Sequence, residues 1–259
     1  MDSILFQKEG PITWITFNDP DRLNALTEEM GREIVRLVSV INKDRDVRVV
    51  ILTGAGRAFS AGGNLDIIEA RTRKKTAVNQ KEMIGFYHRF LSIARIEVPT
   101  IAMINGPAIG AAFAMTLACD LRLASTDAKM GVNFVRLGIS PGMGSTFLLP
   151  SVVGVPTAME LLLTGRTITA EEALKKGVIH HLYAPEVLKE ETIRLANEIA
   201  ANAPVAVRLA KKGVLNNGAA LKKALQFEAR GQAACFKTDD LKEGLAAIRA
   251  KRNPRFSGV

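Results

Sequence analysis

The stretch VRVVILTGAGRAFSAGGNL, residues 47–65, decides the fold expected for this chain. It opens with β-branched and apolar residues, 47–52, in a short run that is typical of a buried strand. The small residues that follow would let backbone come close to a ligand and direct N–H groups toward it. With a helix expected from Asp66, this loop could hold a carbonyl oxygen that becomes negative during a reaction. A plain tight turn is the alternative interpretation, because Gly-rich turns are common.

The same pattern occurs a second time further along the chain. Thr100–Ile104 reads as a strand, and residues 105–112, NGPAIGAA, form another small-residue loop before a helix. Repeated strand, loop and helix units are typical of an α/β fold with parallel strands, whose ligand sites lie at the carboxyl ends of the strands. Two such loops side by side would supply one N–H each to a single oxygen, which is more specific than either loop alone.

Elements on either side of these units can also be predicted. Residues 4–17 alternate and break at a Gly-Pro pair, which predicts a β-hairpin. Thr27 is expected to cap a helix, and Thr169 begins a capping box in a region that is mostly helical from Pro156 onward. The segment 66–78 carries a run of basic residues, so we expect it to be exposed and mobile.

Composition restricts the class of protein. The chain has 259 residues, 47% hydrophobic and 24% charged, which fits an ordinary globular protein of one domain plus a small appendage. The start lacks the features of a signal peptide, no apolar run is expected to span a bilayer, and the two cysteines are too few for a disulfide framework. We therefore expect a cytoplasmic protein without a membrane partner.

The net charge and the spacing of possible metal ligands further restrict the classes of partner that we expect. The formal net charge is +9, which could attract nucleic acid or an anionic small molecule. Aromatic residues make up only 5%, and no nucleic-acid-binding motif is present, so we expect no nucleic-acid partner. Metal ligands with recognisable spacing are also absent from the sequence, and we expect no metal.

Short motifs recur in order along nearly the whole chain. They are Asn18-Asp19-Pro20 with Leu23-Asn24-Ala25-Leu26, Ala58–Leu65, Pro99–Ala102, Asn105-Gly106 with Gly110-Ala111-Ala112, Ala118–Arg122, Gly138–Gly144, Leu163–Arg166, Ala173 with Gly177, and Glu243-Gly244 with Lys251-Arg252, Pro254 and Phe256. In these motifs the chain resembles the enoyl-CoA hydratase/isomerase, or crotonase, superfamily. The resemblance implies a spiral of ββα repeats over residues 1–200 and a C-terminal helical trimerisation region over 201–259.

The resemblance also implies a ligand and an assembly. The ligand would be an acyl-CoA thioester, with coenzyme A as part of the substrate and no separate cofactor. The assembly would be a homotrimer or a hexamer made of two trimers. Apolar residues on the helices after Pro204 favour such an assembly, and they include Val205, Val207, Leu209, Val214, Leu225, Phe227 and Phe236.

Site residues carried over from the resemblance fall in the same loops. The backbone N–H groups of Ala61 and Ala111 would form the oxyanion hole. Arg22, Leu23 and Ala25 would line the adenosine and pantetheine groove, and Lys251 would reach a CoA phosphate. The substrate-binding set implied in this way is Arg22, Leu23, Ala25, Ala61, Gly62, Gly63, Asn64, Leu65, Gly110, Ala114, Phe134, Gly142 and Lys251.

The acid and base positions of the family are empty in this sequence. Family hydratases place glutamates where this chain has Ala114 and Phe134, and related isomerases place an acid where it has Gly142. Water addition needs a base for the water and an acid for the α-carbon. Tyr87 and His88 are the remaining candidates for proton transfer; alternatively, Tyr87 packs in the pocket wall and His88 faces solvent.

Three classes of function stay open at this point. One is an enzyme that stabilises an acyl-CoA enolate, in the breakdown of fatty-acid or of aromatic or alicyclic acyl-CoA, without the usual hydratase glutamates. The second is an acyl-CoA hydrolase or decarboxylase of the same superfamily. The third is an acyl-CoA-binding protein without catalysis. The empty acid positions predict poor hydration of crotonyl-CoA in every case.

Overall fold

The computed structural model describes residues 2–214 and 218–257 of the chain. The large sheet has the strand order β1-β2-β3-β4-β6-β9, in which β1 is antiparallel to β2 and the other neighbours are parallel. The predicted hairpin and the α/β class are therefore confirmed. Its strands are β1 (Ile4–Glu9), β2 (Ile12–Phe17), β3 (Val49–Gly54), β4 (Thr100–Ile104), β6 (Leu121–Ser125) and β9 (His181–Tyr183). A smaller sheet is formed by β5 (Ala108–Ile109), β7 (Lys129–Gly131) and β8 (Ile168–Thr169).

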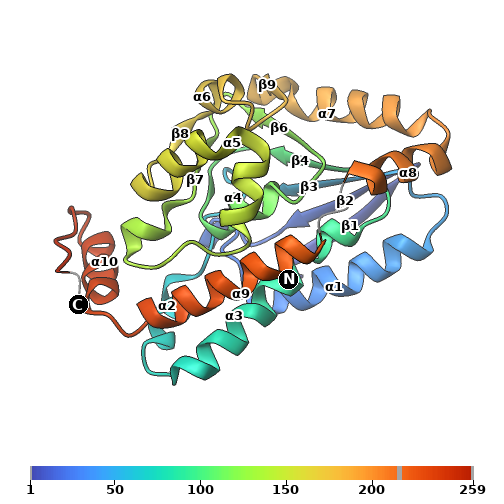
Figure 1. Ribbon diagram of the computed structural model, residues 1–259. Helices are drawn as coiled ribbons and strands as arrows, with labels where there is room; N and C mark the ends of the chain where they lie inside the picture. The colour runs from blue at the N-terminus through green and yellow to red at the C-terminus, as the bar shows by residue number, and fades with distance from the viewer. Residues whose placement is uncertain (1, 215–217, 258–259) are drawn as a thin grey trace.

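Helices surround the large sheet in Figure 1. Two of the predicted caps are confirmed, since the Thr27 hydroxyl accepts from Met30 N–H and the Thr169 hydroxyl accepts from Glu172 N–H. The helices are α1 (Glu28–Lys43), α2 (Leu65–Arg71), α3 (Thr76–Phe90), α4 (Ala111–Thr116), α5 (Ser145–Thr164), α6 (Ala170–Lys175), α7 (Pro185–Ala200), α8 (Pro204–Val214), α9 (Gly218–Cys235) and α10 (Asp239–Arg249).

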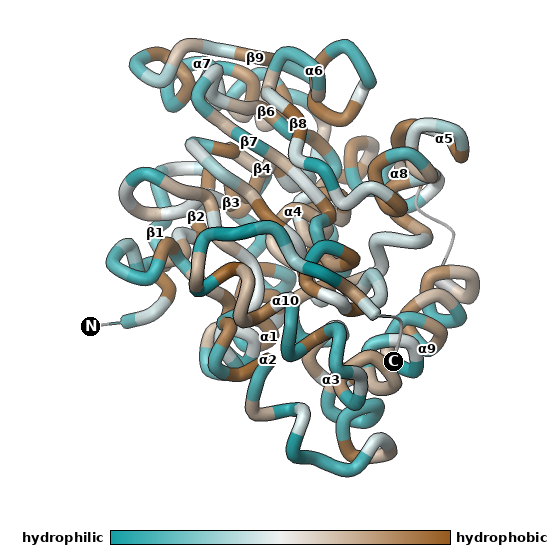
Figure 2. The backbone as a smooth tube through the Cα atoms, turned by 90° about the vertical axis from the view of Figure 1, so that its left-hand side faces the viewer, coloured by the Kyte–Doolittle hydropathy of each residue, from teal (hydrophilic) through white to brown (hydrophobic). Residues whose placement is uncertain are grey.

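The central strands are buried on both faces. Val49 and Ile51 of β3 join the apolar cluster under α7, whereas Val50 and Leu52 join the larger cluster that includes α1 and α3. Successive side chains of a strand point to opposite faces, so each face takes every second residue. Because both faces are covered, the strand reads as a continuous apolar run, and hydrophobic residues gather along the central strands in Figure 2.

The C-terminal helices pack back onto the first half of the chain. Helix α9 packs along α3, and α10 packs against α2. Lys237 donates a 2.7 Å hydrogen bond to the carbonyl of Thr72, and Arg249 pairs with Asp66 and Glu69. The segment 66–78 is thus folded into α2 and the start of α3. Residues 73–78 are exposed, as expected, whereas Arg71 is buried, and the mobility of the segment stays a prediction. The division into regions 1–200 and 201–259 stays a prediction.

The apolar faces of α8 and α9 differ from one another. Leu225 of α9 and Phe236, which follows α9, are buried within the chain itself, so their inclusion in an assembly face is wrong. Helix α8 has no buried residue, and its Val205 and Leu209 are 66% and 62% exposed. Phe227 of α9 is exposed as well. An uncovered apolar face therefore remains on α8.

Helix α5 is the one long apolar helix among the described residues. Its mean hydropathy of 1.6 over 20 residues would allow it to cross a bilayer by length and composition alone, so the expectation that no apolar run reaches that length is wrong. The helix is broken at Gly154, whose φ of 74° and ψ of 162° are not helical, and Pro150 and Pro156 flank the break.

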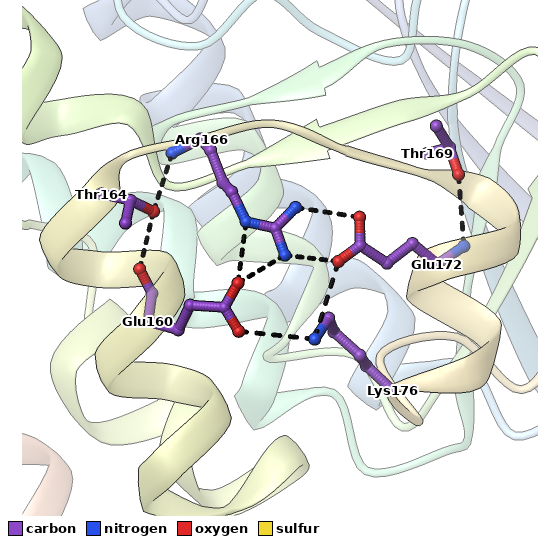
Figure 3. Close-up of polar contacts among 6 residues, drawn as sticks. All are labelled: Glu160, Thr164, Arg166, Thr169, Glu172 and Lys176. Atoms are coloured by element: carbon purple, nitrogen blue, oxygen red, sulfur yellow. Dashed lines mark hydrogen bonds and ion pairs between the residues drawn. The ribbon is translucent and has the colours of Figure 1, made fainter.

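A cluster of charged side chains joins α5 to α6 (Figure 3). Arg166 donates to Glu160 of α5 at 2.7 Å and to Glu172 of α6 at 2.9 Å, and Lys176 lies 3.5 Å from Glu160. These hydrogen bonds hold the pKa values of Glu160 and Glu172 below the ordinary range. The cluster is solvated, so solvent weakens each pair. It fixes one helix against the other and does not border the site described below.

Candidate active site

The two small-residue loops lie side by side, as predicted. Ser60 N–H donates to the carbonyl of Pro107 at 3.1 Å, and Ile109 N–H donates to the carbonyl of Ser60 at 3.1 Å. Gly62 has a φ of +89°, and a Cβ added to it would lie 2.4 Å from the Ile109 carbonyl oxygen. Only glycine meets both conditions, so Gly62 allows the close approach of the two loops.

Asn24 holds the first loop in place through hydrogen bonds. This residue is fully buried, with its own φ at +55°, and its side-chain amide donates to the carbonyls of Ala55 and Ala58 at 2.9 Å. Its backbone carbonyl accepts the hydroxyl of Ser60 at 2.7 Å. Asparagine tolerates this left-handed backbone conformation better than most residues do. The segment around Asn24, from an earlier part of the chain, therefore holds the loop in place.

The free N–H groups of the loops differ from those that were predicted. Ala61 N–H donates to the carbonyl of Leu23 at 2.8 Å, so its role in the oxyanion hole is corrected. Gly62 N–H also has a partner, because it donates to the Ser60 hydroxyl at 3.1 Å. Gly62 itself is buried and does not border the cavity. By contrast, none of the described residues accepts a hydrogen bond from Gly63 N–H or Ala111 N–H. Both groups are therefore available as donors.

Gly63 and Ala111 border the same cavity, which has a volume of about 100 Å³. Its wall is mostly apolar and comes from the two loops, from α2, α3, α9 and α10, and from the turn at 133–137. Apolar side chains in the wall are Leu26, Leu65, Ile67, Ile68, Met83, Phe86, Phe134, Leu137, Ile139, Phe236 and Ile248. The polar side chains are Asn64, Arg71, Tyr87, Asn133 and Gln232, and no Asp, Glu or His of residues 2–214 and 218–257 borders the cavity.

Tyr87 lies in the cavity wall and is held in place by α9. The side chain is 1% exposed, and its hydroxyl donates to Gln232 Oε1 at 2.7 Å. Burial, and then the charge of Glu228, raise the pKa of Tyr87 well above its ordinary value, against a smaller opposing effect of Arg71. The phenol is therefore protonated at neutral pH and can act as a donor but not as a base.

His88 does not belong to this cavity. It is exposed on the other side of α3, and it borders a separate groove toward α8. Partial burial, with the charges of Arg95 and Lys222, lowers the pKa of His88. Its prediction as a catalytic residue is wrong, because adjacent residues of a helix point about 100° apart and Tyr87 already faces the cavity.

The three positions at which family members have an acid lie in different surroundings in this chain. Phe134 borders the cavity, as predicted, whereas Ala114 is fully buried in α4 outside the wall, and its prediction as a substrate contact is corrected. Gly142 is also outside the wall, because the Tyr87–Gln232 pair covers it. A Cβ at Gly142 would lie 2.5 Å from both the Tyr87 hydroxyl and Gln232 Nε2. An acid at this position has no room without moving that pair.

The remaining predicted binding residues divide into two groups. Ala61, Asn64, Leu65 and Gly110 border the cavity, and the Asn64 side chain also caps α2 by accepting from Asp66 N–H and Ile67 N–H. The second group lies outside the acyl cavity, with Arg22 and Lys251 exposed on the surface. For this group a role toward the CoA portion stays a prediction; its members are Arg22, Leu23, Ala25 and Lys251.

Three polar residues of the wall were missed by the sequence reasoning. Arg71 stands in the basic run, which hides it among exposed charges, yet it is only 5% exposed. Asn133 precedes Phe134, and its Oδ1 lies 3.1 Å from where a Gly110 Cβ would be. Gln232 comes from α9, and its amide donates to the Ser140 carbonyl at 3.0 Å. Only Asn133 has a local signal, because it is next to one of the family's acid positions.

Comparison with known proteins identifies the family of the chain. The family model described as enoyl-CoA hydratase/isomerase matches residues 7–259. A short-chain-enoyl-CoA hydratase of Clostridium acetobutylicum is 36% identical over 97% of this chain and 96% of its own length. A crotonyl-CoA hydratase of Syntrophomonas wolfei is 36% identical over 98% of both chains. The crystal structure of an enoyl-CoA hydratase from Mycobacterium avium subsp. paratuberculosis superposes with a TM-score of 0.87, at 30% identity over 99% of both chains.

The parallel sheet, the paired loops and the apolar cavity beside them thus define an α/β protein of the crotonase fold that acts on acyl-CoA. The chain belongs to the enoyl-CoA hydratase/isomerase family and is an enzyme of that superfamily.

Proposed function

We propose that this chain binds a short acyl-CoA thioester and stabilises its enolate without a carboxylate acid or base. The observation that carries the proposal is the pair of unpartnered N–H groups, Gly63 and Ala111, at the wall of one cavity. Two fixed donors aimed at one oxygen stabilise the negative charge that an enolate places there. The acyl chain would extend into the apolar part of the cavity.

The size of the cavity supports a short acyl group. An apolar cavity of roughly 150 Å³ holds benzene, so a cavity of about 100 Å³ favours a chain of a few carbon atoms. Relatives named as short-chain-enoyl-CoA and crotonyl-CoA hydratases agree with this size. Their names do not settle the reaction of this chain, because the cavity wall contributes Phe134 at one of the family's acid positions.

The proton steps distinguish the reaction from ordinary hydration. Among the described residues of the wall, Tyr87 supplies the only hydroxyl, and its raised pKa keeps it protonated. A protonated phenol can deliver a hydrogen bond to the acyl group, but it cannot activate water. The proposed reaction is therefore one in which the oxyanion hole contributes most of the rate enhancement.

The test is a panel of acyl-CoA thioesters followed by mass spectrometry and calorimetry. Butyryl-CoA should bind and raise the melting temperature, because a ligand that binds only the folded state stabilises it. Mass changes then identify the reaction: gain of water, loss of carbon dioxide, release of CoA, or deuterium at the α-carbon in heavy water. Binding without any mass change would point to the acyl-CoA-binding alternative. Absence of binding at millimolar concentration would overturn the proposal.

A further inference from the structure

Arg71 is a buried cation in the wall of an otherwise apolar cavity. Its side chain is 6% exposed, and it borders the cavity together with Met83, Phe86 and Tyr87. A guanidinium carries a fixed positive charge and five N–H donors. Burying such a group is costly unless it is paired and its donors are used. The burial of Arg71 therefore requires acceptors for its N–H donors.

The protein satisfies Arg71 only in part. Nη1 donates to Glu82 Oε2 at 2.9 Å, and the second carboxylate, Glu28, lies 3.7 Å from Nη2, which is too far for a hydrogen bond. No other side-chain hydrogen bond of Arg71 is made to any described residue. Most of its donors are therefore available to a ligand in the cavity.

The charges of the side chains around Arg71 do not balance either. Glu82 is shared with Lys74, whose Nζ lies 2.7 Å away, and Glu28 is shared with Arg89. Three cations thus face two carboxylates, which leaves this cluster with one positive charge in excess, and Arg71 is the member of the cluster that borders the cavity. One further carboxylate would neutralise the cluster. It would also use the free donors of the Arg71 guanidinium, which matches a carboxylate in a bidentate geometry.

The position of Arg71 fits the far end of an acyl chain. Helix α2 runs from Leu65, next to Gly63, to Arg71, and six steps of 1.5 Å separate its two ends by about 9 Å. Helical side chains tilt toward the N-terminus of the helix, so the guanidinium lies nearer the oxyanion hole than its Cα does. A thioester oxygen at Gly63 and a carboxylate at Arg71 can thus belong to one short acyl group lying along α2.

We propose that the acyl group of the substrate ends in a carboxylate, and that Arg71 binds this carboxylate at the far end of the cavity. The inference rests on the proposed function, since it assigns a substrate class to the same site. The class is the CoA monothioester of a short dicarboxylic acid. A neutral acyl chain of the same length would leave the remaining N–H donors of Arg71 without an acceptor among the described residues.

The experiment compares three thioesters by calorimetry: succinyl-CoA, butyryl-CoA, and the CoA thioester of monomethyl succinate, which has no charge. Succinyl-CoA is expected to bind at least about tenfold more tightly than the other two, since hydrogen bonds to charged groups are the strong ones. Arg71→Met should remove this preference. Lys74→Met is the matched control, because Lys74 shares Glu82 but lies outside the cavity wall, and it should keep the preference.

Each outcome is decisive. Equal affinity of the wild-type chain for succinyl-CoA and its methyl ester would overturn the inference, whether or not Arg71→Met folds. An equal loss of affinity for free CoA and for all three thioesters in Arg71→Met would also overturn it, because Arg71 would then bind the CoA portion. Binding of butyryl-CoA without any preference leaves the proposed function intact, whereas no binding of any thioester overturns that function first.

Discussion

The hydroxyl of Tyr87 on α3 donates a 2.7 Å hydrogen bond to the side-chain carbonyl of Gln232 on α9, and the pair lies directly over Gly142. The family's isomerases place an acid at the position of Gly142, and here two neutral groups occupy that space. Both groups are buried and their partners are fixed. The deep end of the cavity is thus polar without being an acid or a base at neutral pH.

Removing one partner of this pair should reduce stability. Tyr87→Phe leaves the buried Gln232 carbonyl without its donor, which should lower the free energy of unfolding by about 1–3 kcal/mol. Urea denaturation measures the change. The control is the double variant Tyr87→Phe with Gln232→Leu, in which both polar groups are absent and part of the loss should be recovered. A single variant as stable as the wild-type chain would contradict the role given to this hydrogen bond.

Ala111 allows a clean test of the oxyanion hole. It is the first residue of α4, where proline is tolerated because the N–H has no partner within the helix. Ala111→Pro removes one of the two donors and should lower the rate on any substrate found in the panel by about 10² to 10³. Ala111→Gly keeps the N–H and is the matched control. Equal rates for Ala111→Pro and the control would show that this N–H does not contact the reacting oxygen.

Crotonyl-CoA hydration should be slow in the native chain. Phe134 borders the cavity and Ala114 is buried in α4, so neither of the family's glutamate positions can transfer a proton. Acid–base catalysis by a placed side chain contributes about 10² to 10⁴ in rate, so turnover should fall at least about 10² below an ordinary enzyme's ~10 per second. Steady-state absorbance at the enoyl band measures it.

The matching gain-of-function variant is Phe134→Glu, because Phe134 borders the cavity whereas Ala114 lies outside its wall. It should hydrate crotonyl-CoA faster than Phe134→Gln, which has the same shape without an ionisable group. If the native chain already turned over at tens per second, an acid from outside the described cavity wall would have to reach the substrate.

The C-terminal segment should loosen in acid. Hydrogen bonds from Arg252, at 2.6 Å, and from Arg255 N–H lower the pKa of Glu243 from 4.5 to about 2. A carboxylate with a depressed pKa in the folded state stabilises that state above its ordinary pKa, and this contribution is lost as the pH falls. The protection of residues 251–257 against hydrogen exchange, after division by the intrinsic rate at each pH, should therefore fall between pH about 4.5 and about 2. Glu243→Gln should show near neutrality the low protection that the native chain shows in acid, and Glu190→Gln, exposed on α7, should not.

Assembly should follow from the uncovered face of α8. Light scattering is expected to give a trimer or a hexamer, because Val205 and Leu209 are about two-thirds exposed on a helix without buried residues. Leu209→Asp should reduce the assembly to smaller species. Lys212→Asp, which changes an exposed polar position of the same helix, should not. A native chain that is monomeric at micromolar concentration contradicts this prediction.

Local sequence was sufficient for most of the fold. The strand Thr100–Ile104 and the cap at Thr27 agree with the structure because each depends on neighbouring residues, through apolar patterning or a side-chain bond three residues away. The paired loops were also predictable, because parallel strands place their carboxyl ends together. What spacing could not reveal is which N–H is free. Ala61 is blocked by the carbonyl of Leu23, which comes from a different part of the chain.

The polar residues of the cavity wall could not be predicted from the sequence for the same reason. Arg71 stands in a run of charges that is normally solvated, and its burial depends on Glu28 and Glu82, which belong to two other helices. Gln232 is far from Tyr87 in sequence, and only the packing of α9 on α3 brings them together. Such tertiary contacts carry no periodic signal within one segment.

The packing of α9 and α10 against the loops also sets the order in which the site can form during synthesis. Both loops lie in the first half of the chain, but Gln232, Phe236 and Ile248 close the cavity from helices translated later. A nascent chain that has reached α8 carries both N–H donors facing an open apolar hollow. Because a ligand stabilises only a state that binds it, acyl-CoA is expected to stabilise the complete cavity more than a precursor that lacks part of its wall. Until α9 and α10 pack, the apolar residues of that hollow are exposed to solvent, as they are in other partly folded chains.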